Sequence, residues 1–143
     1  MSRVFLDTNF FIYWLEDRGE LAKKVFTLAT RMRQREDEMI TSTLTVGEIL
    51  VKPVRTRDTV MIAQYEKLLG DPAITVVPFD RHCGRKYAQI RQDAGIKPPD
   101  AIQLACAAQA NCSLFLTNDD RLTRKVVHGI DFIVSLERAL SII

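Results

Sequence analysis

Short apolar runs alternate along the chain with longer segments whose apolar residues recur at helical spacing. The short runs predict strands at residues 3–6, 39–41, 74–77, 114–116 and 130–134. The longer segments predict helices at residues 10–16, 21–32, 46–51, 57–69, 81–94, 100–111 and 119–127, and a C-terminal helix that Ser135 caps. Proline at position 53 should stop the third helix, and Gly70 and Gly95 should end the fourth and fifth.

The alternation of strands and helices predicts an α/β fold, because parallel strands need helical crossover connections. We expect a three-layer α/β/α sandwich, with residues 1–143 forming a single domain. Sheets of this kind bind ligands beyond the carboxyl ends of their strands, which is where chemistry is to be sought.

Composition and charge narrow the possible classes of protein but do not indicate a function. The chain has 143 residues, 47% of them apolar, and a formal net charge of +2, which is too small to indicate a nucleic-acid partner. Basic residues occur in local groups such as Arg31 to Arg35, but an ordinary solvated surface explains them equally well. Three cysteines without metal-binding or redox spacing, no signal peptide and no membrane-spanning run predict a cytoplasmic protein.

Four acidic residues stand where strands end or helices begin. Asp7 directly follows the first predicted strand, and Asp119 follows the strand at 114–116. Glu48 lies near the start of a helix that follows a strand, and Asp100 begins a helix after two prolines. In a parallel sheet these positions share one edge, so the four carboxylates can converge although they are far apart in sequence.

Each of these acids also has a purely structural interpretation. Asp7, Asp100 and Asp119 are suitable helix caps, and Thr45-Val46-Gly47-Glu48 matches a capping box. Taken together, however, converging carboxylates repel one another unless a cation lies between them. Carboxylate oxygens suit Mg²⁺ or Mn²⁺, and no His or Cys set is present to favour a softer metal.

Four sequence blocks resemble the PIN-domain nucleases, and the resemblance covers essentially the whole chain. The blocks are Val4-Phe5-Leu6-Asp7-Thr8-Asn9, Ser42-Thr43-Leu44-Thr45-Val46-Gly47-Glu48-Ile49-Leu50, Pro99-Asp100-Ala101-Ile102-Gln103-Leu104-Ala105 and Leu116-Thr117-Asn118-Asp119. Within the family, the sequence is most similar to the VapC-like toxins of toxin–antitoxin pairs.

The resemblance implies a five-stranded parallel sheet of order 3-2-1-4-5 and hydrolysis of RNA. The four acidic positions of the family fall on Asp7, Glu48, Asp100 and Asp119, as catalytic residues and ligands of Mg²⁺ or Mn²⁺. Its polar helper falls on Thr117, and Asn9 matches the residue that braces the first Asp. The neighbouring Asp120 is an additional carboxylate, either outward-facing or supporting the site.

We therefore expect a metal-dependent endoribonuclease, with a small antitoxin as its protein partner. The segment 10–15 is more apolar than burying one helix face requires, so part of it could meet an antitoxin helix. Complete burial, or a contact in a homodimer, is an equally open interpretation. A PIN-like domain that binds RNA or a partner without cutting is the alternative function.

Two other classes of protein place an acid after the first strand. A phosphatase of the haloacid-dehalogenase type needs a second Asp two residues later, where this chain has Asn9. A response-regulator receiver domain needs adjacent acids near the first strand and a phosphoacceptor after a middle strand. Asp80 could be assigned that second role, but Thr8 and Asn9 beside Asp7 do not fit the first.

Overall fold

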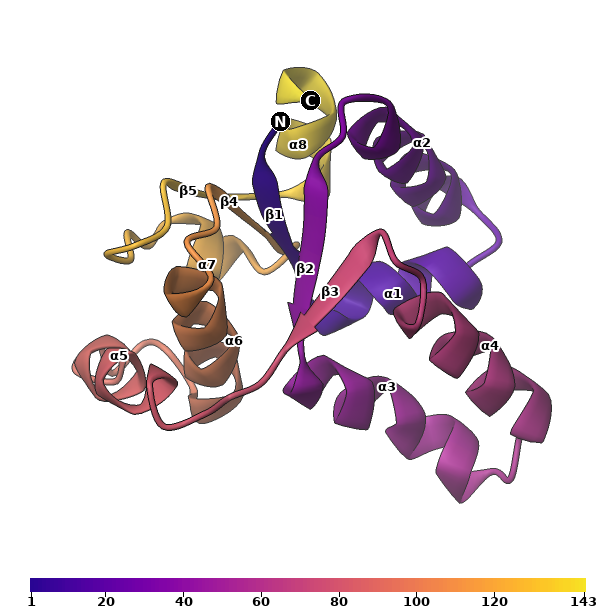
Figure 1. Cartoon of the computed structure of the whole chain (residues 1–143), viewed down its shortest axis with the longest axis horizontal. Helices are drawn as coiled ribbons and strands as arrows, with labels where there is room; N and C mark the ends of the chain where they lie inside the picture. Colours follow the sequence, from indigo (N-terminus) through magenta and orange to yellow (C-terminus); the bar gives the residue numbers. More distant parts are fainter.

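Five parallel strands form one sheet at the centre of the structure, a computed structural model that describes residues 1–143 (Figure 1). The strands are β1 (Arg3–Leu6), β2 (Glu38–Ser42), β3 (Ile74–Val77), β4 (Leu114–Leu116) and β5 (Phe132–Val134). Their order is β3-β2-β1-β4-β5. The predicted α/β class and strand order are therefore confirmed. A receiver domain has the order 2-1-3-4-5, so that alternative is excluded.

Eight helices surround this sheet. They are α1 (Thr8–Leu15), α2 (Glu20–Gln34), α3 (Thr43–Arg55), α4 (Thr59–Leu69), α5 (Cys83–Ile90), α6 (Pro98–Gln109), α7 (Asp120–Thr123) and α8 (Leu136–Ile142). None of them is both long and apolar enough to cross a membrane.

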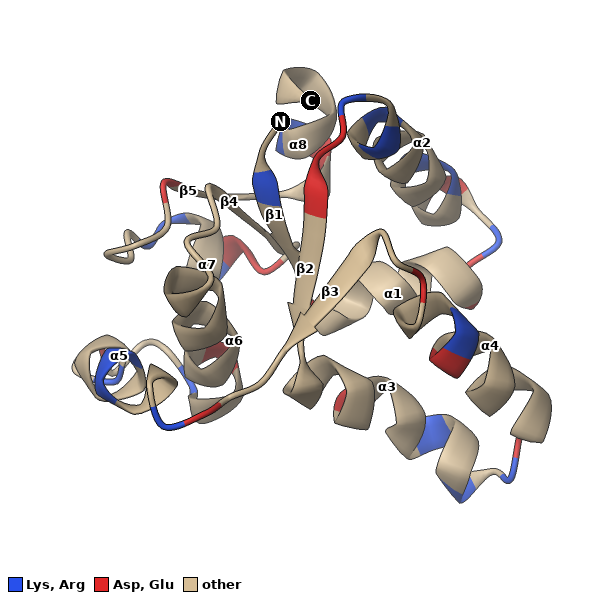
Figure 2. Ribbon diagram, in the orientation of Figure 1, with Lys and Arg blue, Asp and Glu red and all other residues tan.

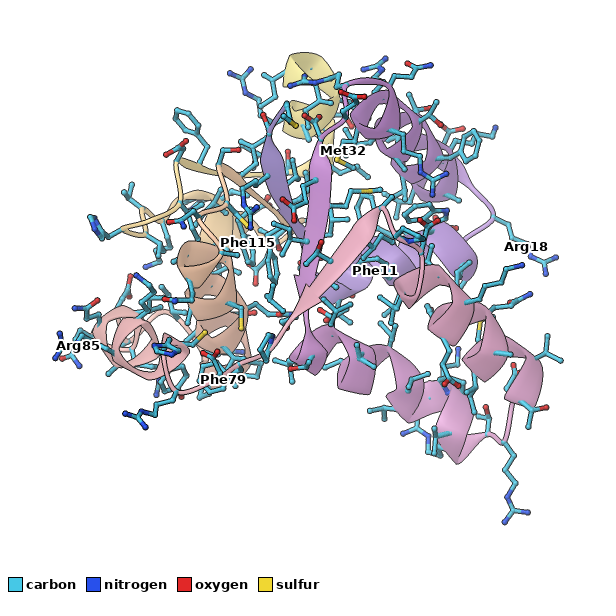
Figure 3. All side chains as sticks on the ribbon, in the orientation of Figure 1. Phe11, Arg18, Met32, Phe79, Arg85 and Phe115 are labelled. Carbon is cyan, nitrogen blue, oxygen red and sulfur yellow. The ribbon has the colours of Figure 1, made fainter.

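The strands are buried on both faces, and successive side chains enter two separate cores. Val4 and Leu6 join a core with residues of α1, α2, α4 and α8, whereas Phe5 points into a second core with α5, α6 and α7. Phe5 stacks there on Phe115, with ring centroids 5.1 Å apart. Figure 3 shows Phe11 and Phe115 on opposite sides of the sheet. The helices thus cover both faces, as expected for a three-layer sandwich.

Several predicted element ends were wrong. Helix α3 starts earlier than expected and runs through Pro53 to Arg55, because the proline lies in the last turn and loses only one hydrogen bond there. Helix α5 ends at Ile90 rather than near Gly95, and α7 is a single turn that ends at Thr123 instead of residue 127. Strand β5 starts at Phe132, two residues later than predicted. Gly70 and Ser135 do end α4 and begin α8 as predicted.

Candidate active site

Strand register places Asp7 beside Thr117. Leu6, the last residue of β1, pairs with Leu116, the last residue of β4, which in turn pairs with Val134 of β5. The Asp7 amide donates to the Leu116 carbonyl oxygen at 3.4 Å. Asp7 and Thr117 therefore leave adjacent central strands at the same level. This level is the carboxyl edge of the sheet, where the sequence predicts the site.

Asp7 is a helix cap and also the most perturbed acid of this edge. Its Oδ1 accepts a hydrogen bond from the Phe10 amide at 3.3 Å at the start of α1. Burial raises the pKa of Asp7 to about 6, and the negative charge of Asp100 adds to the rise. Hydrogen bonds from the Thr117 hydroxyl and from the Phe10 and Asn9 amides oppose it, but they do not offset burial.

Asp119 caps α7 and forms an ion pair with Arg121, which no sequence pattern had singled out for the site. The Arg121 amide and Nε donate to Oδ1 of Asp119 at 2.9 and 3.3 Å, and Nη2 donates to Oδ2 at 3.0 Å. The hydrogen bond from the guanidinium is the main reason that the pKa of Asp119 lies below its usual value. The Asp119 amide itself donates to the Thr117 hydroxyl at 3.2 Å, which ties α7 to the end of β4.

Glu48 does not close a capping box, so that structural interpretation was wrong. Helix α3 begins at Thr43, and Glu48 lies in its second turn, too far along to bond the start of the helix. Its Oε1 instead accepts a hydrogen bond from the Thr8 hydroxyl at 2.6 Å, in the first turn of α1. Glu48 is therefore turned toward the segment that carries Asp7.

The buried side-chain amide of Gln103, on α6, stabilises the contact between Thr8 and Glu48 by a hydrogen bond to Thr8. The Nε2 atom of Gln103 donates to the hydroxyl oxygens of Thr8 at 3.3 Å and Thr45 at 2.8 Å, and its Oε1 accepts from Ser42. Gln103 is only 4% exposed, so its polar atoms depend on these partners. One side chain thus joins the starts of α1 and α3 to α6.

Asp100 interacts electrostatically with each of the other three predicted acids. It lies in the first turn of α6 but does not cap that helix, which begins after Lys97. Burial raises the pKa of Asp100, and the charges of Asp119 and Glu48 raise it further, whereas Arg121 and Lys97 lower it. Because Asp7 also senses Asp100, all four predicted acids influence one another through this residue. Figure 2 shows acidic segments on α3, on α6 and beside α7.

The remaining predicted residues make fewer contacts. Thr117 is only 3% exposed and lies between Asp7 and Asp119. Asn9 is exposed and interacts with Asp7 through its backbone amide rather than its side chain. Asp120 is exposed at the start of α7, with no hydrogen bond or ion pair to its side chain. Asn118, a member of the fourth sequence block, accepts a hydrogen bond from the Leu136 amide at 3.0 Å and so anchors α8.

The donor set fits a hard divalent cation in chemical type. All four acids offer carboxylate oxygens, and the three cysteines are buried elsewhere, in the core beneath α5 and α6 or at its margin. As the side chains are placed, no three acidic, His or Cys groups are close enough to hold a metal ion together. The Thr8 hydroxyl engages only Oε1 of Glu48, but Arg121 engages both carboxylate oxygens of Asp119, so binding of a cation by Asp119 requires that ion pair to open.

Sequence comparison identifies the family. The model of the PIN domain matches residues 4–127. The chain belongs to the PIN-domain family. This confirms the resemblance seen in the four sequence blocks, including the block that contains Asp7 and the one that contains Asp119. A search of curated protein sequences found no match.

Solved structures show the same fold. A chain of VapBC2 from Rickettsia felis, in a complex bound to a fragment of promoter DNA, matches with a TM-score of 0.75 and 13% identity, covering 93% of this chain and 98% of that one. FitAcB from Neisseria gonorrhoeae matches with a TM-score of 0.64 and 22% identity, over 81% and 87%. DNA-bound VapBC from Salmonella typhimurium matches with a TM-score of 0.66 and 22% identity, over 95% and 99%.

The supporting contacts of this PIN domain were not visible to sequence reasoning. Gln103 looks like one polar residue on a helix of small apolar ones, and only the fold brings it beneath Thr8 and Ser42. Arg121 looks like one more surface cation of α7. Its position two residues after Asp119, on the helix that Asp119 caps, is the signal that could have identified it, because capping turns that carboxylate back toward the first turn.

Proposed function

We propose that this PIN domain, residues 1–143, is a metal-dependent endoribonuclease that uses Mg²⁺ or Mn²⁺, and that it is the toxin of a toxin–antitoxin pair. The observation that carries the nuclease proposal is the placement of four acids at one edge of the sheet: Asp7 and Asp119 follow the adjacent strands β1 and β4, Glu48 is hydrogen-bonded to Thr8 beside Asp7, and Asp100, whose pKa the charges of Asp119 and Glu48 raise, lies in the first turn of α6. A fold alone would not suffice, since one fold hosts many activities.

The acids have separate parts in the proposed reaction. Asp7, Asp100 and Asp119 would hold the cation, with Glu48 binding directly or through water. When bound, a divalent cation supplies hydroxide near neutral pH and stabilises charge on the scissile phosphate. Thr117 would keep Asp7 ionised and oriented, since its hydroxyl lowers the pKa of that carboxyl against the effect of burial. The Gln103 amide would hold Thr8, and through it Glu48, in place.

Cleavage of RNA by the purified chain tests the reaction. We expect a mixture of cellular RNAs to be cut in Mn²⁺ or Mg²⁺ and to remain intact in EDTA. Asp131→Asn is a matched control, because this carboxylate is exposed and precedes β5 at the opposite edge of the sheet. Its activity should equal that of the wild type, whereas Asp100→Asn should be inactive.

The outcomes of this assay separate the candidate functions. Undiminished cleavage in EDTA would eliminate the metal mechanism. Binding of RNA without cleavage under any metal would favour the alternative, a PIN domain that binds RNA or a protein without cutting.

The proposed antitoxin would cover apolar surface between α1 and α2. Trp14 and Leu15 of α1 are only partly buried, and Phe26 of α2 is 65% exposed. These three side chains line one hollow of the surface, together with Ala22, Lys23 and Thr27. The structural similarity to chains of VapBC complexes supports an antitoxin as the occupant of this hollow. The alternative occupant is a second copy of this chain, in a homodimer.

Expression in the native host tests the toxin proposal. Strong expression of the chain alone should slow growth, and co-expression of the neighbouring small gene should restore it. Phe26→Asp should abolish that rescue without relieving toxicity, because it places a charge in the proposed interface. Normal growth on strong expression of active enzyme would remove the toxin assignment and leave the nuclease assignment standing. Sedimentation of the chain alone distinguishes a homodimer from a monomer.

A further inference from the structure

We infer that Arg121 is a phosphate-binding residue for the RNA, held by Asp119 until the cation takes that carboxylate. This inference rests on the proposed function. Its first ground is that the guanidinium engages both Asp119 oxygens, through Nε to Oδ1 at 3.3 Å and Nη2 to Oδ2 at 3.0 Å. A cation and the guanidinium therefore compete for the same carboxylate.

The competition favours a divalent cation. The ion pair is open to solvent, with the Arg121 side chain 59% exposed and the Asp119 side chain 31% exposed. Exposed pairs of this kind contribute at most a small free energy, because water screens the charges and both side chains lose freedom. A double positive charge also relieves the repulsion among Asp100, Asp119 and Glu48 more fully than a single one does.

A released Arg121 stays at the site, because its backbone remains fixed. The Leu122 amide donates to the Asp119 carbonyl oxygen at 3.0 Å, and the Asp119 amide donates to the Thr117 hydroxyl at 3.2 Å, so the first turn of α7 is tied to the end of β4 by bonds that do not involve the Asp119 carboxylate. The side chain can turn into solvent but cannot leave the edge of the acidic cluster.

In the structure the guanidinium has hydrogen bonds and an ion pair with Asp119 alone. Asp120 is adjacent in sequence, and neighbouring side chains on a helix do not face each other. Asp100 and Glu48 belong to the proposed cation site. A phosphate of the RNA is the remaining group with complementary charge and geometry, since a guanidinium binds two phosphate oxygens in parallel.

This exchange predicts opposite effects of one substitution on two ligands. Without Arg121, the cation no longer displaces an ion pair, so Arg121→Ala should bind Mn²⁺ about two- to fivefold more tightly in calorimetric titrations without RNA. The same change should weaken binding of single-stranded RNA about tenfold or more. RNA binding is measured by fluorescence anisotropy in Mg²⁺ with a short single-stranded RNA analogue that resists hydrolysis, so that all four acids stay in place.

Three further measurements test whether the change in RNA affinity comes from a lost phosphate contact. The slope of log affinity against log salt concentration should fall by about 0.7 in Arg121→Ala, the value for one lost phosphate contact on a single strand. Arg121→Lys should restore the slope but not the full affinity, because lysine lacks the planar fork. In EDTA the effect of Arg121→Ala on RNA affinity should shrink, because Asp119 then keeps the guanidinium.

Arg18→Ala is the matched control, because it removes the same charge from the loop between α1 and α2. Figure 3 shows the Arg18 side chain pointing away from the molecule, and it forms no ion pair. Neither the Mn²⁺ affinity nor the RNA affinity should change in this variant.

The outcomes separate this inference from the proposed function. Tighter Mn²⁺ binding with weaker RNA binding supports the exchange. Weaker binding of both ligands would show that Arg121 only shapes Asp119 and α7, and unchanged RNA affinity would exclude a phosphate contact; either result overturns the inference while wild-type cleavage stands. A wild-type protein that neither binds Mn²⁺ nor cleaves RNA would overturn the proposed function, and this inference with it.

Discussion

At the scale of single residues, Asp7 combines a structural and a chemical role. The carboxylate caps α1, yet its burial raises its pKa to about 6, so at neutral pH the metal-free protein holds a charge there that its surroundings disfavour. Capping explains why the residue can be polar at this position. It does not explain why the carboxylate lies where both the Thr117 hydroxyl and the charge of Asp100 influence its pKa.

Substitution of Asp7 by Asn separates the two roles. Asn caps helices as well as Asp does, so the fold should persist, and loss of the disfavoured charge should stabilise the metal-free protein by up to about 3 kcal/mol at pH 7.5. Cleavage of RNA should be abolished, because the amide is a poor ligand for a divalent cation. Urea unfolding in EDTA and a cleavage assay measure the two effects. A variant that retains activity would show that Asp7 is only a cap.

The pH dependence of stability follows from the same group. The pKa of Asp7 is about 6 in the folded protein against 3.8 as the ordinary value, so the folded state binds more protons between these pH values. The contribution of Asp7 to the stability of the metal-free protein should therefore be most favourable at the acidic end and fall as pH rises from about 4 to 6. The difference between wild type and Asp7→Asn isolates this contribution from the other carboxyl groups. A difference that stays constant across this range would contradict the raised pKa.

Residue-level prediction from sequence was limited by contacts between elements. The positions of Asp7 and Asp119 at strand ends could be predicted, because each directly follows an apolar run. The partners that orient the acids could not. Arg121 reaches Asp119 only because α7 is a single turn with this cap, and Thr8 meets Glu48 only because β1 and β2 are neighbours.

At the scale of elements, Gln103 joins three helices beneath the acids. Its amide contacts Thr8 of α1, Thr45 of α3 and Ser42 at the end of β2. The helices α1 and α3 start from adjacent strands, and α6 runs back toward the sheet from the same edge. A single buried side chain therefore sets the spacing of the elements that carry Asp7, Glu48 and Asp100.

Removal of this amide should cost both stability and activity. Gln103→Ala leaves buried hydroxyl groups with fewer partners and should lower the free energy of unfolding by about 2 kcal/mol. Cleavage should also slow, since Thr8 no longer holds Glu48 from a fixed position. Gln109→Ala is the control, because Gln109 is exposed at the last residue of α6. Equal unfolding midpoints for the two variants in urea would show that the Gln103 contacts add nothing.

The elements themselves were predictable in type but not in length. The apolar runs identified all five strands, because parallel strands buried on both faces read as short continuous apolar segments. The predicted ends of α5 and α7 lay too far along the chain. The helical spacing of apolar residues continues through 91–94 and 124–127, although the backbone is no longer helical there. The end of α3 was instead predicted too early, at Pro53, because a proline in the last turn does not stop a helix.

At the scale of the whole molecule, topology makes the site. Strand β1 lies at the centre with β2 on one side and β4 on the other, so the chain leaves the sheet in opposite directions from this point. The α/β class follows from the alternation of elements. The order of the strands does not follow from alternation alone, and the resemblance to the PIN domain supplied it.

Binding of a cation should stabilise the whole fold, because a ligand held only by the native state shifts the unfolding equilibrium. The acids come from α3, α6 and the ends of β1 and β4, so none of them can assemble a site in the unfolded chain. We expect the melting temperature to rise with Mn²⁺ concentration up to the millimolar range. With a ligand at 100 times its Kd, the added stability would be about 2.7 kcal/mol, which corresponds to about 9 °C for a domain of this size.

Asp100 should dominate this thermal shift, since its charge is coupled to Asp119 and Glu48 and is also felt by Asp7. Asp100→Asn should remove most of the Mn²⁺-induced rise, yet it should raise the melting temperature of the metal-free protein, because it relieves repulsion within the cluster. Asp131→Asn should leave both values unchanged. Differential scanning calorimetry with and without Mn²⁺ measures these shifts. A melting temperature that does not respond to Mn²⁺ in the wild type would mean that the four acids do not form a cation site.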